Sequence, residues 1–371
     1  MKQKKKTPTR RKWLFCLLPA VLAAALYLLL PHFPRFTEYV WVRGVFRVFS
    51  VPLTWLMSLF PFSVTELVVV AGIPALLALA VVFIVRLVRR ADRRRVAERV
   101  ARFVVWCLSL FLLLFMVMDG GNFSRLSTAS LFGLNEKTYD AAFLQAVTAD
   151  LAQKTNAARA QVAEDADGCM ILSASKGATL RAADDCYKNL RERYPFLVSG
   201  VWRVKSVALS HQWSYTGYTG VYCPWLSEVS INTDTPVSEW GHTAAHEIAH
   251  TMGFAREDAC NFVAYLACVT SDNPDFVYSG YLAAFTYCAN ALYDYDKDAY
   301  RTVYLTLSDG VRRDLKQRSS YWKQFSGQVM DSSQSFNDAF IKANGVESGI
   351  LSYDEAVSLI LQYYDTNEIL A

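Results

Sequence analysis

Three long stretches without a charged residue constrain this chain more than any other feature of its sequence. They cover Trp13–Pro31, Leu67–Val85 and Phe103–Met118, each 16 to 19 residues long. A helix that crosses the hydrocarbon core of a bilayer needs about 20 apolar residues. The third stretch is slightly short, but the aliphatic stem of Arg102 can extend along the lipid. Residues 1–118 offer too little polar sequence to cover three such helices in a soluble core, so we predict a membrane region there.

A fourth uncharged segment, Val48–Thr65, is interrupted by Pro52 and Pro61. The distribution of basic residues decides how we interpret it. Residues 1–12 carry seven basic side chains and no acid, and residues 86–102 carry eight arginines against two acids. Because loops rich in Lys and Arg stay in the cytoplasm, the two tracts share that side only if the chain crosses three times. We therefore predict an interfacial or re-entrant segment at 48–65, a cytoplasmic N-terminus and an extracytoplasmic C-terminal domain.

The remaining residues, 119–371, have the composition of an acidic globular domain. They carry 20 Lys and Arg against 30 Asp and Glu, a net charge of −10. A protein that binds nucleic acid needs a basic surface, so we expect no nucleic-acid partner. About 250 residues are enough for a domain with its own core.

Local patterns in this part of the chain predict an α+β domain that is mostly helical. Periodic apolar residues favour helices over 136–165 and 178–193, and the chain after Thr243 is again mostly helical. Three short segments rich in Val, Ile, Ser and Tyr lie between them and predict a small β-sheet. These segments are Ser206–Ser210, Gly220–Cys223 and Glu228–Asn232. The eight cysteines include no CxxC pair, which argues against a thiolate zinc ribbon.

The run His246-Glu247-Ile248-Ala249-His250 is the sharpest indication of chemistry. Residues four apart lie on one face of a helix, so the two imidazoles can bind one Zn²⁺. Glu247 lies beside them, where its carboxylate can reach a water molecule that the metal activates. A hydrolytic zinc site needs three protein ligands and one open position, so a third ligand must come from elsewhere.

The residues after the motif supply candidates for that third ligand. Metzincins have a histidine where this chain has Arg256. Glu257 is the natural candidate, since it lies in the first turn of the next predicted helix. Asn261, one turn later, could hydrogen-bond a metal ligand from outside the coordination sphere, and Glu-x-x-x-Asn resembles the pattern of gluzincin peptidases. Asp258 and His242 remain as rival ligands.

Four further residues are candidates for substrate contact. Tyr222, Tyr278 and Tyr281 could each donate a hydrogen bond to an oxyanion, and the sequence does not choose among them. Glu228 lies in a predicted strand and faces either the substrate or the solvent. That strand could offer its edge to an extended peptide.

Several runs of residues around the motif resemble a known family. They are Gly220–Pro224, Glu228–Asn232, His246–Asp258, Asn261–Leu266, Tyr278–Leu282 and Lys342–Gly345. The chain is similar there, and over nearly its whole length, to the bacterial family called domain of unknown function 3810. The resemblance implies a membrane-anchored, gluzincin-like zinc metallopeptidase with a zincin-like exterior domain. This chain departs from the family pattern at Ala259, where a second acid is usual.

Motif and resemblance together predict an enzyme that hydrolyses peptide bonds on the outer face of the membrane. Zn²⁺ would be its cofactor, and Glu247 would be the general base on a zinc-bound water. A peptide or protein substrate and the lipid bilayer would be its partners. The alternative is a non-catalytic membrane protein whose exterior domain binds a peptide or cell-envelope partner. Its metal would then be structural, with four protein ligands. A transporter component is disfavoured, because the predicted spans carry no internal charge.

Overall fold

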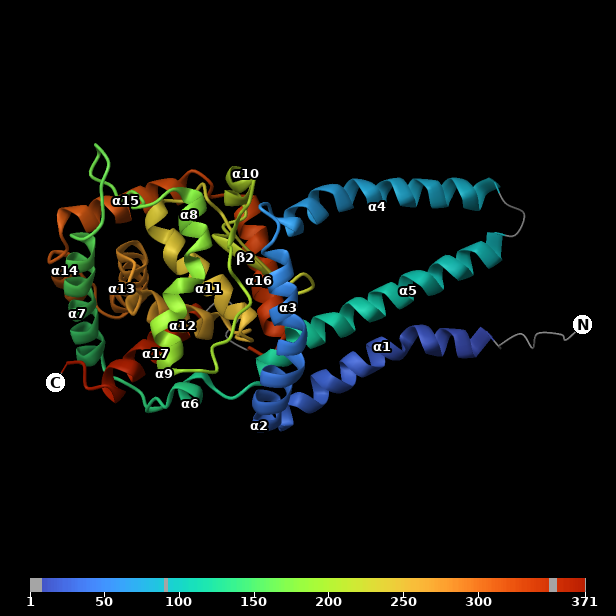
Figure 1. Ribbon diagram of the computed structural model, residues 1–371, viewed down its shortest axis with the longest axis horizontal. Helices are drawn as coiled ribbons and strands as arrows, with labels where there is room; N and C mark the ends of the chain where they lie inside the picture. Colours follow the sequence, from blue (N-terminus) through green and yellow to red (C-terminus); the bar gives the residue numbers. More distant parts are fainter. Residues whose placement is uncertain (1–8, 90–92, 347–351, 371) are drawn as a thin grey trace, which may run out of the picture.

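Long helices project from one side of a globular body (Figure 1). The computed structural model describes residues 9–89, 93–346 and 352–370. Parts of the two basic tracts, residues 1–8 and 90–92, lie outside the described residues. The described chain is mostly helical and contains a small three-stranded sheet. The coarse fold predicted from the sequence is therefore confirmed.

The projecting helices coincide with the three uncharged stretches. They are α1 (Thr9–Leu29), α4 (Val64–Arg89) and α5 (Arg93–Met118). Leu76, Leu77 and other apolar side chains of α4 are largely exposed, which is the pattern of a helix that faces lipid. By length and composition, four helices of the described residues could cross a membrane. They are Arg11–His32, Pro34–Met57, Val64–Arg86 and Arg93–Met118.

The second of these four, Pro34–Met57, is called the crosswise segment here, and it includes residues 48–57 of the predicted interfacial segment 48–65. It consists of three helical pieces that follow one another: α2 (Pro34–Phe36), the π-helical η2 (Thr37–Phe46) and α3 (Arg47–Met57). The short η1 (Leu30–His32) precedes it at the end of α1. Figure 1 shows α3 running crosswise to α1 and α5, against the globular body. The contact is close, because a Cβ atom at Gly200 would lie 2.2 Å from the carbonyl oxygen of Val51. This segment therefore packs as part of the body, unlike α4.

A small sheet lies next to this segment, since the hydroxyl of Thr54 in α3 lies 2.7 Å from that of Ser227, directly before the last strand. The sheet consists of β1 (Lys205–Ser206), β2 (Gly220–Cys223) and β3 (Glu228–Ile231) in the order β1-β3-β2. Strand β3 pairs with β1 in parallel and with β2 in antiparallel register. The predicted strands at β2 and β3 are confirmed. Of the first predicted strand, Ser206–Ser210, only Ser206 lies in β1, because the chain turns at residues 208–209 and α10 (Ser210–Ser214) follows.

Helices from distant parts of the sequence share one core in the body. The central ones are α7 (Ala141–Arg159), α11 (Trp240–Thr251), α12 (Glu257–Val269), α13 (Pro274–Tyr295) and α17 (Ser352–Thr366). Leu151, Ile248, Phe262 and Phe285 lie fully buried between them, which gives the body a large apolar driving force for folding. Shorter or peripheral helices complete it: η3 (Gly120–Ser124), α6 (Thr128–Phe132), α8 (Lys176–Arg181), η4 (Ala183–Tyr187), α9 (Lys188–Arg193), η5 (Val237–Glu239), α14 (Lys297–Tyr304), α15 (Asp309–Lys323) and α16 (Gln328–Ala343).

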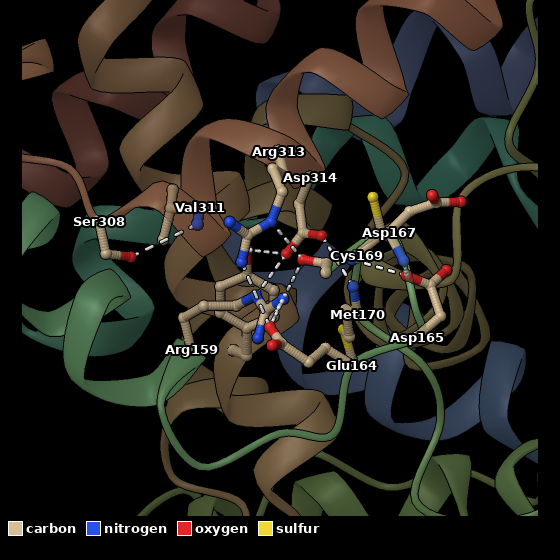
Figure 2. Close-up of polar contacts among 12 residues, drawn as sticks. Arg159, Glu164, Asp165, Asp167, Cys169, Met170, Ser308, Val311, Arg313 and Asp314 are labelled. Carbon is tan, nitrogen blue, oxygen red and sulfur yellow. Dashed lines mark hydrogen bonds and ion pairs between the residues drawn. The ribbon is translucent and has the colours of Figure 1, made fainter.

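A buried polar network ties α7 and α15 to the loop that follows α7. Figure 2 shows Asp314 accepting hydrogen bonds from Arg159 Nε at 2.7 Å and from the backbone N–H of Met170 at 2.8 Å. The hydroxyl of Tyr278 donates to the same carboxylate at 2.7 Å. Because both partners of the Arg159–Asp314 pair are buried and further hydrogen-bonded, the network satisfies the charges that it buries.

Glu228 holds the start of α4 against the sheet. Its carboxylate accepts hydrogen bonds from the backbone N–H groups of Val64, at 2.9 Å, and Thr65, and it pairs with Lys205. Both side chains of that ion pair are about 1% exposed. Burial alone would raise the pKa of Glu228, but Lys205 and the N–H donors outweigh it and lower the pKa. Glu228 is thus an ionised N-terminal cap for a predicted membrane helix.

Glu228→Gln should destabilise the full-length protein. The substitution leaves the ammonium group of Lys205 buried without its counter-charge, at a cost of about 3–5 kcal/mol. Thermal unfolding in detergent should show a clearly lower midpoint. The double variant Lys205→Met/Glu228→Gln should recover part of the loss, because it removes both charges. An unchanged midpoint for Glu228→Gln would refute this role.

Candidate metal centre

The HExxH motif occupies the last turns of α11, whose other face is buried in the core. A tight turn then reverses the chain before α12 begins at Glu257. Gly253 in this turn has a φ of +84°, a conformation that only glycine adopts without strain. A Cβ atom there would also lie 2.6 Å from Cγ1 of Val42 in η2. The sequence thus needs glycine at this point, both for the turn and for its contact with the N-terminal segment.

The two histidines converge on one carboxylate. Nε2 of His246 lies 3.0 Å from Oε2 of Glu257, and Nε2 of His250 lies 3.9 Å from Oε1 of the same group. The imidazole centroids are 5.1 Å apart. The three side chains proposed from the sequence as metal ligands therefore meet at one point.

The other ring nitrogens are held by protein acceptors. Nδ1 of His250 donates to the carbonyl oxygen of Phe254 at 2.8 Å. Nδ1 of His246 lies 2.7 Å from Oδ1 of Asn261, which also accepts the hydroxyl of Tyr287 at 3.1 Å. When Nδ1 carries the proton, the lone pair of a neutral imidazole is on Nε2. This is the outer hydrogen bonding that orients metal-binding histidines, and it directs both Nε2 atoms toward Glu257.

When no cation is bound, the protonation of the histidines balances the negative charge of Glu257. Burial lowers the pKa of His246, but the carboxylate of Glu257 outweighs it and raises the pKa to about 9. Burial lowers the pKa of His250 to about 4 despite the same carboxylate. One imidazolium therefore pairs with Glu257 at neutral pH, in the position that a cation could take.

Glu247 lines a cavity beside the two histidines and is almost fully buried. Burial raises its pKa to about 8; His246 opposes this rise and Glu257 adds to it. Gly220 on β2 makes room for its side chain, since a Cβ atom there would lie 2.5 Å from Oε1 of Glu247. The sequence singled out Glu247 but assigned no role to this glycine.

Cys260 lies next to the histidines, although no pattern in the sequence pointed to it as a neighbour. Its thiol lies 3.1 Å from the carbonyl oxygen of Phe254 and 3.4 Å from Nδ1 of His250. It can be grouped with His246 and His250, because their ligand atoms lie within 4.8 Å of one another. However, it approaches His250 from the Nδ1 side, away from Glu257. Burial also raises the pKa of this thiol well above its usual value, which disfavours the thiolate that binds metals.

A cavity of about 740 Å³ opens onto the two histidines, Glu247 and Glu257. Asp119, the first residue after α5, also lines this cavity and is only 7% exposed. No side chain among the described residues donates a hydrogen bond to its carboxylate. Burial, followed by the nearby charge of Glu257, raises its pKa to about 8. The only signal in the sequence was its place as the first charged residue after the third uncharged stretch.

The structure separates the four proposed substrate-contact residues. Tyr222 lines the cavity and its ring stacks on His250, with centroids 5.7 Å apart. Its hydroxyl lies 3.4 Å from the carbonyl oxygen of Met118. Tyr278, Tyr281 and Glu228 do not line the cavity, and two of them belong to the buried networks described above.

The two rival ligands are engaged elsewhere. Asp258 pairs with Arg256 at 3.0 Å. His242 lines the cavity, but its Nε2 lies 3.3 Å from the carbonyl oxygen of Asn261. Neither side chain faces the carboxylate of Glu257 together with the motif.

Comparison with known proteins yields one match. A family model described as "Protein of unknown function (DUF3810)" matches residues 41–361, which include most of the crosswise segment, the cavity and most of α17. No curated protein and no solved structure matches the chain.

Zinc affinity of the purified full-length protein should rise with pH between 6 and 8. A cation must displace the proton that His246 retains up to about pH 9, and metal binding that releases one proton gains about tenfold in affinity per pH unit. Competition with a chelating dye measures this slope. Glu257→Gln should flatten the slope as well as weaken binding, because it removes the carboxylate that keeps His246 protonated. An affinity independent of pH would contradict the paired imidazolium.

Proposed function

We propose that this chain, which belongs to the family described as protein of unknown function (DUF3810), is a membrane-anchored, zinc-dependent metallopeptidase. One observation carries the proposal. The Nε2 atoms of His246 and His250 face the carboxylate of Glu257 in a cavity that also holds Glu247. The topology predicted from the basic tracts places the reaction on the outer face of the membrane.

The residues present fit a hydrolytic zinc ion. Two imidazoles and one carboxylate are a common ligand set for catalytic zinc, which keeps a further position open. The cavity beside them supplies room for a substrate and for water. A bound Zn²⁺ would polarise the carbonyl group of a peptide bond and lower the pKa of water to roughly 7. His246, His250 and Glu257 would hold it.

Glu247 performs the proton transfers in this proposal. Its carboxylate accepts a proton from the attacking water while the new C–O bond forms at the peptide carbonyl. It then passes that proton to the nitrogen of the leaving amine as the C–N bond breaks. Ionised Glu247 is needed for the first step, and a nearby divalent cation favours that state over the neutral one that burial imposes.

Cys260 is the observation that favours the alternative function. If its thiolate joined His246, His250 and Glu257, four protein ligands would close the site, as in a structural zinc centre. The exterior domain would then serve as a binding module. We favour the open site, because the thiol donates to Phe254 and lies on the Nδ1 side of His250.

Glu247→Gln should retain zinc but lose hydrolysis, by a factor of about 10²–10⁴. His250→Ala should lose both zinc and activity, because it removes a ligand. Cleavage of a mixed-sequence peptide library by the full-length protein, together with metal analysis, measures both properties. Asp258→Asn is the matched control, since this neighbouring acid faces Arg256 instead. Undiminished cleavage by Glu247→Gln would remove Glu247 from the mechanism.

Gly220→Ala tests the placement of Glu247 without altering a charged group. The added methyl group must displace the carboxylate, so hydrolysis should fall by at least about tenfold, as expected when a general base is misplaced. Zinc content should not change, because no metal ligand is moved. Full activity in this variant would show that Glu247 need not occupy the observed position.

A further inference from the structure

The cavity wall contains the end of a predicted membrane helix. Phe115 lies in the last turn of α5 and lines the cavity. Asp119, the first residue after α5, lines it too. Trp225, also in the lining, stacks on Phe111 with centroids 4.1 Å apart and planes at 17°. The indole N–H also lies 3.4 Å from the carbonyl oxygen of Phe111. The site thus begins where α5 leaves the predicted bilayer.

Helix α16 forms another part of the same wall. Phe340 contacts Phe115 at a centroid distance of 5.8 Å and lines the cavity. At the end of α16, the carbonyl oxygen of Ala343 accepts the hydroxyl of Tyr27 from α1 at 3.1 Å. Figure 1 places α16 on the side of the body from which α4 and α5 project. Two predicted membrane helices therefore touch the helix that borders the site.

The mouth of the cavity exposes aromatic rings. Phe336 is 73% exposed, Phe340 38% and Trp225 37%, although all three line the cavity. Exposed apolar side chains at a cavity usually mark an interaction site, and aromatic residues are enriched where a protein meets the membrane–water interface. Trp55 and Phe62, in and just after the crosswise segment, are also half-exposed. The aromatic mouth, formed by Trp225, Phe336 and Phe340, therefore lies on the same side of the body as the predicted membrane helices.

We infer that the substrate is a polypeptide anchored in the same bilayer and cleaved close to its anchor. The inference rests on the proposed peptidase function and specifies its substrate class. A chain that leaves the bilayer beside α5 passes the aromatic mouth and reaches Glu247 and the histidines within the same cavity. Asp119 lines the cavity directly after α5, so its carboxyl group lies where it can hydrogen-bond the backbone of that chain.

The test uses full-length protein in phosphatidylcholine vesicles and one mixed-sequence peptide library in three formats. The first format carries a dialkyl lipid anchor and a spacer of about five residues, which spans roughly 17 Å when extended. The second has the same anchor with a spacer of about 40 residues, and the third has no anchor. Mass spectrometry of the products gives initial rates, and Glu247→Gln provides the background. The short-spacer format should be cleaved fastest, about 10²-fold faster than the free library.

The outcomes separate this inference from the proposed function. Cleavage of the long-spacer or free library without cleavage of the short-spacer library would overturn the inference and leave the peptidase intact, because the site would then lie well above the bilayer. Equal rates for all three formats would also overturn it. Absence of Glu247-dependent cleavage in every format would refute the peptidase, and the inference with it.

Phe336 tests the aromatic mouth directly. Phe336→Ser should lower the rate for the short-spacer library about tenfold more than the rate for the free library. Phe336→Leu keeps an apolar side chain and should therefore retain most of the wild-type rate on the short-spacer library. The side chain is largely exposed, so the substitution should leave the thermal midpoint in place. An equal loss on both libraries would show that Phe336 does not distinguish anchored chains.

Discussion

A single carboxylate shared by two largely buried imidazoles is the interaction on which the site depends. Glu257 comes from the first turn of α12, and the imidazoles come from the last turns of α11. Burying an unpaired carboxylate would cost several kcal/mol, so this arrangement needs a positive charge between the helices. In the free protein that charge is the proton on His246. The same geometry suits a divalent cation, so charge balance and metal chemistry point to the same three side chains.

Packing across the nominal domain boundary at residue 118 keeps this cluster in place. The carbonyl oxygen of Phe254 orients His250. The guanidinium group of Arg125 lies over the ring of Phe254, 4.2 Å from its centroid. Arg125 in turn pairs with buried Glu38 of the crosswise segment at 2.9 Å. Residues from both sides of the boundary thus support one site. The predicted membrane region is therefore part of the scaffold of the site.

The sequence predicted features that depend on local spacing and missed those that depend on tertiary contact. HExxH and Glu257 lie within twelve residues on two consecutive helices, so their spacing and the gluzincin-like pattern suggested that they could meet. Asp119 precedes the HExxH motif by more than a hundred residues in sequence. It reaches the same cavity only because α5 ends beside that cavity. Glu228 and Tyr278 looked suited to substrate contact, yet buried partners occupy them. No local pattern reveals such partners, since they come from distant segments.

X-ray absorption at the zinc edge of the full-length, zinc-loaded protein tests the central claim most directly. The proposed site predicts a first shell of nitrogen and oxygen only, at about 2.0–2.2 Å, with the scattering of two imidazoles. Glu257→Gln should change that shell, whereas Cys260→Ser should leave it as it is. A zinc–sulfur distance of about 2.3 Å that disappears in Cys260→Ser would contradict the account. It would place the metal on the thiol side of His250 and favour a structural centre.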